Sequence, residues 1–129
     1  MITIDEHPTF DEAEIRAAER SLEAALESPD PTAWVFEYTE DAVFDGGGDH
    51  AVQGRAALLA MATSMSPLSS VSIRPLRTEG RADIATVWFE ASWVSGRPPD
   101  TGATVHVRGM MLWRKDAAGR WRVAVEHIG

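Results

Sequence analysis

The sequence predicts an α+β fold in which helices pack against one face of a curved, antiparallel sheet. Two observations lead to this class. Apolar residues recur at helical spacing through the first half of the 129-residue chain, whereas beyond about residue 71 they alternate with polar residues, as they do in strands. Helices followed by a run of strands are typical of α+β proteins, because alternating strands and helices would predict a parallel sheet instead.

Length and composition indicate one ordinary globular domain, residues 1–129, with residues 1–8 as a loose N-terminal segment. Hydrophobic residues make up 44% of the chain and charged residues 25%. We find no apolar run of membrane-spanning length and no signal peptide, so we expect a cytoplasmic protein with no membrane partner. The net charge of −8 argues against nucleic acid as a partner. The absence of cysteine excludes disulfides and thiolate metal sites.

Three helices are expected before the strands. Thr9 and Glu12 have the spacing of a capping box at the start of the first helix. The dipeptide Asp30-Pro31 supplies an N-cap and a first helical residue for the second. The third helix begins near Arg55 and ends before Pro67. The apolar positions expected on the three helices are Ile15, Ala18, Leu22, Ala25, Leu26, Trp34, Val35, Tyr38, Leu58, Met61, Ala62 and Met65.

Strands account for most of the remaining chain. A short strand at 42–44 runs into the glycine loop 46–48. Four longer strands follow, separated by glycine- and proline-containing turns, at 71–77, 83–94, 103–114 and 120–128.

The last two strands form a hairpin whose register decides which side chains share a face. If Lys115 pairs with Arg120, then Arg108 lies opposite His127 and polar residues gather at one end of a face. We expect this face to line a pocket; it carries Thr104, His106, Arg108, Met110, Leu112, Val123, Val125 and His127. The other face would form a homodimer interface through Val105, Val107, Met111 and Trp113, because a monomer would expose that apolar stripe. A different register would make this second face the core instead.

Two segments resemble a known superfamily. Residues 38–58, YTEDAVFDGGGDHAVQGRAAL, and the ending LWRKDAAGRWRVAVEHIG resemble the SnoaL-like and ketosteroid-isomerase-like proteins of the nuclear transport factor 2-like superfamily. The ending is also similar to the calmodulin-dependent kinase II association domain. The resemblance implies a cone-shaped α+β barrel, in which a curved, mostly antiparallel sheet wraps three helices around a pocket. The resemblance also implies a homodimer, which is common in this group. It further implies that five residues face the concave side: Ile84, Thr86, Trp88, Glu90 and Ser92.

The sequence departs from the isomerases at two positions. Gly46 stands where the resemblance would place the general-base aspartate, and Asp45 lies one position early. Leu22 stands near the position of a hydrogen-bonding tyrosine. Both differences argue against steroid isomerisation.

His127, Glu90 and Arg108 are the candidate catalytic residues. An imidazole beside a carboxylate and a guanidinium can relay a proton or orient an anionic ligand. In this hypothesis His127 carries the proton, Glu90 is its partner or the base, and Arg108 holds an anionic group, while Tyr38 donates a hydrogen bond. The alternative is a structural ion pair with a hydrogen-bonded histidine at the mouth of the cone.

The candidate ligand-binding residues combine aromatic and polar side chains: Trp34, Tyr38, Phe44, Asp45, Trp88, His106 and Met110. Alternatively the aromatic residues form only the core, and Asp45 opens a loop. No metal site is expected, because the four histidines are widely spaced, and no cofactor motif is present.

The sequence therefore predicts a protein that binds a small organic molecule and can act as a cofactor-independent acid–base enzyme of the isomerase, lyase or hydrolase type. The alternative is a non-catalytic dimerisation or assembly module of the same fold.

Overall fold

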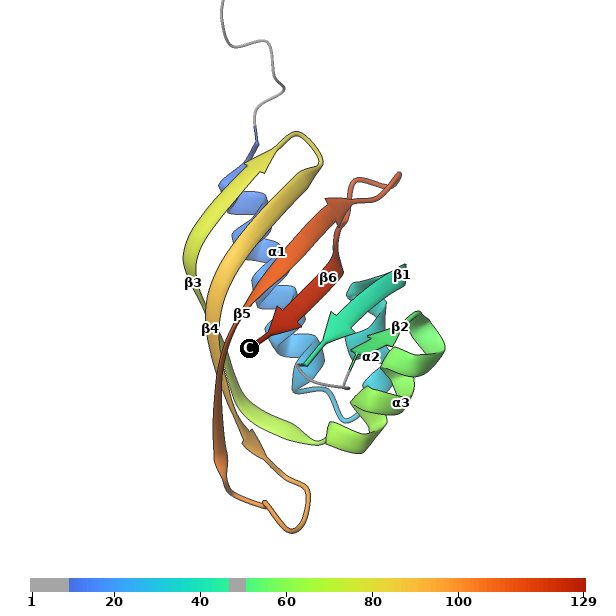
Figure 1. The fold of residues 1–129 in the computed structure, drawn as a ribbon, viewed down its shortest axis with the longest axis vertical. Helices are drawn as coiled ribbons and strands as arrows, with labels where there is room; N and C mark the ends of the chain where they lie inside the picture. Colours follow the sequence, from blue (N-terminus) through green and yellow to red (C-terminus); the bar gives the residue numbers. More distant parts are fainter. Residues whose placement is uncertain (1–9, 47–50) are drawn as a thin grey trace, which may run out of the picture.

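A computed structural model describes residues 10–46 and 51–129. The elements, in chain order, are α1 (Glu12–Leu26), α2 (Pro31–Phe36), β1 (Tyr38–Asp45), β2 (Ala51–Gln53), α3 (Arg55–Met65), β3 (Leu68–Arg81), β4 (Ile84–Ser95), β5 (Thr104–Lys115) and β6 (Trp121–Ile128). The strands form one sheet in the order β2-β1-β6-β5-β4-β3. This sheet curves without closing, and the helices lie on its concave side (Figure 1). The predicted α+β cone is confirmed.

The sheet is antiparallel except at one place. β1 runs parallel to β6, so the first long strand of the chain lies beside the last one. The other neighbouring strands pair antiparallel. As a result, residues near position 40 and residues near position 125 meet in the middle of the sheet.

Local capping explains where the first two helices begin. The Asp11 side chain accepts a hydrogen bond from the backbone N–H of Ala13 at 2.9 Å, so Asp11 is the N-cap of α1. Thr9, the predicted cap, lies outside the described residues. Asp30 caps α2 as predicted, accepting from the Thr32 N–H at 2.9 Å. No helix of the described chain is long and apolar enough to cross a membrane.

Several strands begin or end away from their predicted positions. Tyr38, expected on the second helix, is the first residue of β1, and the three-residue strand β2 was not predicted. β3 continues through Pro75 with a register shift beside it. This proline is tolerated because β3 is an edge strand and pairs with a neighbour on one side only. A proline in an inner strand would remove a hydrogen bond from the ladder.

The predicted register of the closing hairpin is wrong. Lys115 pairs with Trp121 rather than Arg120, and Trp113 pairs with Val123. The register then shifts, and Leu112 pairs with Val125, so that Ala124 is an extra residue in β6. Such a β-bulge changes which face the following side chains occupy.

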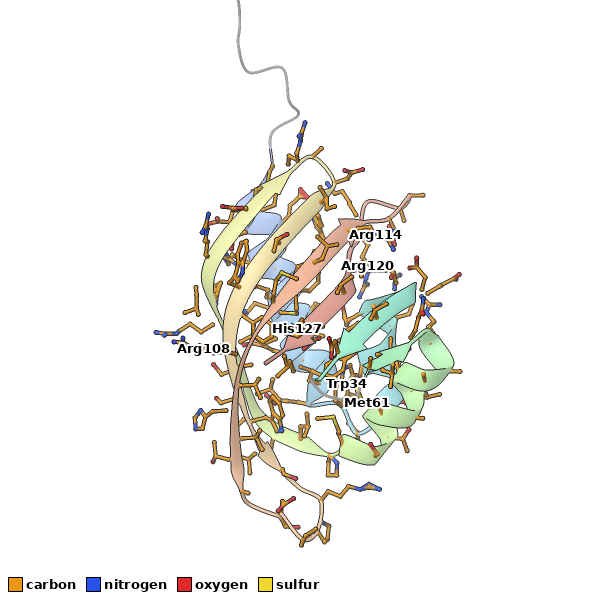
Figure 2. The ribbon with its side chains drawn as sticks, viewed as in Figure 1. Trp34, Met61, Arg108, Arg114, Arg120 and His127 are labelled. Carbon is orange, nitrogen blue, oxygen red and sulfur yellow. The ribbon has the colours of Figure 1, made fainter. Side chains whose placement is uncertain are left out.

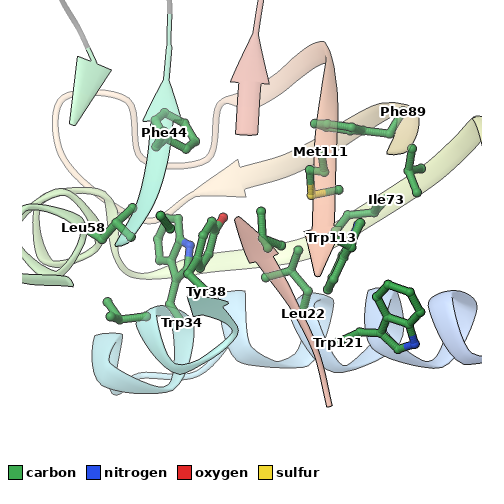
Figure 3. Close-up of a cluster of buried hydrophobic side chains, with 14 of the residues drawn as sticks. Leu22, Trp34, Tyr38, Phe44, Leu58, Ile73, Phe89, Met111, Trp113 and Trp121 are labelled. Carbon is green, nitrogen blue, oxygen red and sulfur yellow. The ribbon is translucent and has the colours of Figure 1, made fainter. Parts of the chain in front are cut away.

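In the structure, the two faces of the hairpin lie on the sides opposite to those predicted. Met111 and Trp113 are 1% and 0% exposed and pack in the core with Phe89 and Val123 (Figure 3). The prediction of a dimer interface through Val105, Val107, Met111 and Trp113 is therefore wrong, because this face covers the protein's own interior. A strand sends alternate side chains to opposite faces, so the other face points outward.

Gly109 permits the close approach of β6 to β5. A Cβ atom at this position would lie 2.1 Å from the backbone carbonyl oxygen of His127. We expect Gly109→Ala to lower the free energy of unfolding by about 3 kcal/mol, because backbone must move to relieve the clash. Urea denaturation measures the change.

Gly119→Ala is the matched comparison. Gly119 has a φ of +82° and no atom near an added Cβ, so its substitution carries only the cost of the left-handed conformation, about 1 kcal/mol. Equal losses in the two variants would contradict the steric role of Gly109.

Candidate functional site

A cavity of about 40 Å³ lies between the helices and the concave face of the sheet. It has room for a small group of atoms, since a single water needs only about 10–15 Å³. Three of the buried side chains that line it carry polar groups, those of Trp34, Tyr38 and Glu126, and the half-buried Trp93 adds a fourth polar group, its indole N–H. The other lining residues are Leu22, Leu26, Phe44, Met65, Leu68, Val71, Ile73, Phe89, Ala91, Trp93, Val107, Met111 and Ile128.

Glu126 is the only carboxyl group among the described residues that line this cavity. It is 8% exposed, and its Oε1 accepts a hydrogen bond of 2.5 Å from the hydroxyl of Tyr38. The indole N–H of Trp34 is buried and makes no hydrogen bond of regular geometry in the described part of the chain, although it lies close enough to the Tyr38 hydroxyl to lower the pKa of Tyr38 slightly against the effect of burial. Figure 3 shows the Trp34 and Tyr38 side chains next to each other. The cavity thus contains one buried acid and two buried donors in apolar surroundings.

The apolar surroundings change how the two titratable groups behave. Burial raises the pKa of Glu126 to about 7, and the hydrogen bond from Tyr38 partly opposes this rise. Burial and the nearby Glu126 charge raise the pKa of Tyr38 well above its usual value. Near neutral pH Glu126 can therefore release or accept a proton, whereas Tyr38 keeps its proton and donates.

The bulge in β6 explains why a carboxyl group points inward. Val123 and Glu126 are three residues apart, so a regular strand would place them on opposite faces. Because Ala124 is an extra residue, Glu126 pairs with Met111 on one side and with Phe44 on the other, and both of these neighbours line the cavity.

The cavity reaches the surface at one end. Met65, Trp93, Val107 and Ile128 line it and are half-buried, whereas the lining residues Leu22 and Phe89 are almost completely buried. A ligand would enter past the half-buried group.

Glu90 and Arg108 lie on the outer face of the sheet, so their predicted place on the concave side is wrong. Figure 2 shows Arg108 on the convex side, pointing away from the helices, and its side chain is 72% exposed. Glu90 bridges Arg108 at 2.6 Å and Arg74 at 2.7 Å. These hydrogen bonds hold the pKa of Glu90 below its usual value. The arrangement fits the structural alternative, an ion-pair network.

His127 is separated from that pair. It lies opposite Met110 instead of Arg108, and its Nδ1 is 3.2 Å from Oδ2 of Asp45 on β1. The structure therefore does not bring His127, Glu90 and Arg108 together as predicted. A catalytic role for His127 would have to use Asp45, where the ends of β1 and β6 are exposed.

The predicted ligand-binding residues divide in the same way. Trp34, Tyr38 and Phe44 line the cavity, and their binding of a ligand stays a prediction. Trp88, His106 and Met110 occupy outward positions on β4 and β5, so they do not line it. The Trp88 ring lies instead beneath the guanidinium of Arg77, at 5.2 Å.

The sequence does contain a signal for Glu126, which was not among the predicted site residues. Glu126 belongs to the same strand face as Met111 and Trp113, and it is the acidic member of a largely apolar set. A carboxyl group on a face that forms the core must be hydrogen-bonded or functional. The signal becomes visible only when that face is assigned to the interior.

No group of three or more metal-ligating side chains occurs within residues 10–46 and 51–129. Two further buried acids, Glu19 and Glu37, lie outside the cavity. Arg16 pairs with Glu19, and Ser21 and Arg120 donate to Glu37. These contacts tie both acids to neighbouring side chains, although burial still raises the pKa of Glu19 and leaves its Oε2 without a partner among the described residues.

Solved structures with the same fold cover almost the whole chain. A ketosteroid isomerase-like protein from Erwinia carotovora atroseptica is 25% identical, with a TM-score of 0.72 over 92% of this chain and 96% of that one. A Catenulispora acidiphila protein in complex with S-DNPA is 16% identical, with a TM-score of 0.73 over 91% and 90%. A putative calcium/calmodulin-dependent protein kinase II association domain from Xanthomonas campestris is 14% identical, with a TM-score of 0.73 over 99% and 96%.

None of the curated proteins matches the sequence significantly. The family model described as the SnoaL-like domain matches residues 18–124, which is most of the chain and includes α3 and every strand from β1 to β5. Together with the cone fold, this match shows that the chain belongs to the SnoaL-like domain family.

Proposed function

We propose that the cone binds a small, largely apolar carbonyl compound, and that Glu126 moves a proton at the carbon beside the carbonyl. The observation that carries this proposal is a buried carboxyl group with a pKa of about 7, facing an otherwise apolar cavity. A base with a pKa near the working pH combines a useful ionised fraction with sufficient basicity.

Each of the three buried polar groups of the cavity has a role in this reaction. Ionised Glu126 takes a proton from the α-carbon, and the electrons of the broken C–H bond move to the carbonyl oxygen. The buried Trp34 N–H, which lies beside the Tyr38 hydroxyl, donates to that oxygen as it becomes negative. Tyr38 positions the Glu126 carboxylate through its 2.5 Å hydrogen bond. Return of the proton to another carbon would complete an isomerisation, and no cofactor is needed.

The family and its structural neighbours support a ligand-binding role. The 25% identical neighbour is named a ketosteroid isomerase-like protein, and the Catenulispora protein holds S-DNPA. The cavity is smaller than pockets for drug-sized ligands, which occupy about 300–1,000 Å³. Compact ligands are therefore favoured, and larger ones require Met65 and Trp93 to move outward.

Exchange of the α-protons of 2-indanone in D₂O, followed by NMR, tests the chemistry. We expect the protein to accelerate exchange, with a rate that rises with pH up to about 7 as Glu126 ionises. Glu126→Gln should lower the rate about 100-fold or more, because Gln accepts no proton. Tyr38→Phe should move the rise to higher pH, since the Tyr38 hydrogen bond lowers the pKa of Glu126.

Glu90→Gln is the control, because Glu90 lies on the outer face. Equal exchange rates for the wild type and Glu126→Gln would refute the proposed role of Glu126. A lower exchange rate in Glu90→Gln alone would instead support the catalytic role predicted for His127, Glu90 and Arg108.

Burial of Glu126 also makes stability depend on pH. Its pKa rises from 4.5 to about 7 on folding, so folding favours the protonated form. This contribution is complete below pH 4.5 and is lost as the pH rises through 7, by about 3 kcal/mol in total. Glu126→Gln should flatten this part of the profile, measured by urea denaturation between pH 4 and pH 8. Glu40→Gln, whose side chain is 85% exposed, should keep the wild-type slope.

We further propose that the homodimer expected from the sequence forms through the outer face of the sheet. This face exposes 39% of Ile84 and carries half-buried Trp88, Met110 and Leu112. Such an apolar stripe is more extensive than scattered surface residues. In light scattering coupled to size-exclusion chromatography, Leu112→Lys should shift dimers to monomers, whereas Ala24→Lys on the opposite layer should not. A monomeric wild type would contradict the dimer.

A further inference from the structure

An open groove continues from the mouth of the cavity. It has a volume of about 540 Å³ and follows the inner side of the β4–β5 hairpin near its tip. Three residues, Met65, Leu68 and Trp93, line both the cavity and the groove. A molecule seated in the cavity and longer than it would therefore extend into this groove.

The groove differs chemically from the cavity. Arg97 and Asp100 line it, together with Ser64 and Ser95, whereas no cationic side chain lines the cavity. Arg97 is the one cation among the described residues that line either hollow. In a chain of net charge −8, a local cation of this kind determines where an anionic group can bind.

Arg97 is held in position by backbone contacts. The neighbouring Gly96 N–H donates to the Pro67 carbonyl at 2.9 Å, and a Cβ at Gly96 would lie 2.8 Å from the Pro67 ring. The Nη1 atom of Arg97 donates to the carbonyls of Thr63 and Ser66, both at 3.3 Å, at the end of α3. These contacts restrain the guanidinium without a carboxylate partner among the described residues, so its charge stays available.

We propose that the groove is a second part of the binding site and that the ligand is an amphipathic carboxylate. Its apolar body occupies the cavity, and its carboxylate lies in the groove and accepts hydrogen bonds from Arg97. The inference rests on the proposed function only for the occupation of the cavity. It adds the chemical class of the ligand.

Asp100 gives the inference a second, opposite test. Its carboxyl group lines the same groove and repels a bound anion. Neutralising Asp100 should therefore strengthen binding of a carboxylate, whereas neutralising Arg97 should weaken it. A groove that binds only apolar groups would respond to neither change.

The experiment compares two probes with the same apolar body, 4-phenylbutyrate and 4-phenylbutanol, by isothermal titration calorimetry. We expect the wild type to bind the carboxylate about tenfold more tightly, because a charge-assisted hydrogen bond replaces a neutral one. Arg97→Gln should abolish this preference by weakening carboxylate binding about tenfold, while the affinity for the alcohol should fall by much less. Asp100→Asn should increase the preference severalfold, and high salt should reduce it.

The outcomes separate the two proposals. Equal affinity of the wild type for both probes, or an unchanged preference in Arg97→Gln, would overturn the role of Arg97 while leaving the cavity as a binding site. Binding of neither probe would overturn both this inference and the proposed function. Ala91→Phe, which fills the cavity, should abolish binding of the alcohol, and its failure to do so would place the apolar body elsewhere.

Discussion

The pairing of β5 with β6 determines what the interior of the cone contains. One extra residue, Ala124, lets both Val123 and Glu126 point inward, although three positions separate them. Without the bulge, one of these two side chains would face outward, and the cavity would lose either its apolar wall or its acid. The core, the cavity and the exposed sheet face all follow from this register.

Enclosing a carboxyl group among apolar side chains costs stability, and the surrounding structure limits that cost without removing it. Tyr38 supplies one hydrogen bond, and protonation removes the charge over part of the accessible pH range. A core built for stability alone would place an apolar residue at position 126. Retention of a buried acid beside a Trp34 N–H that makes no hydrogen bond of regular geometry is the kind of local disadvantage that proteins maintain at functional sites.

The sequence was sufficient for features that depend on near neighbours. The helices, their order before the strands and the Asp30 cap of α2 follow from local spacing, and the resemblance of residues 38–58 identified the fold family correctly. The predicted hairpin register is wrong because apolar residues occur on both faces of β5, so the sequence alone does not show which face forms the core. A bulge depends on packing between distant strands, so counting residue pairs outward from the turn does not reveal it. As a result, the candidate pocket residues on β4 and β5 lie on the outer face instead, and Glu126 was not among the predicted site residues.

The parallel pairing of β1 and β6 also determines the order in which the protein can assemble its interior. Tyr38 and Glu126 are 88 residues apart, and β6 inserts between β1 and β5. During synthesis, the helices α1 to α3 and the strands β1 to β5 emerge before β6, the strand that joins the two halves of the sheet. Until β6 docks, β1 and β5 each present an unpaired edge, which is a template for pairing with another chain. Because this last step closes long-range contacts, we expect it to be slow. The Tyr38–Glu126 hydrogen bond can form only after β6 has docked beside β1.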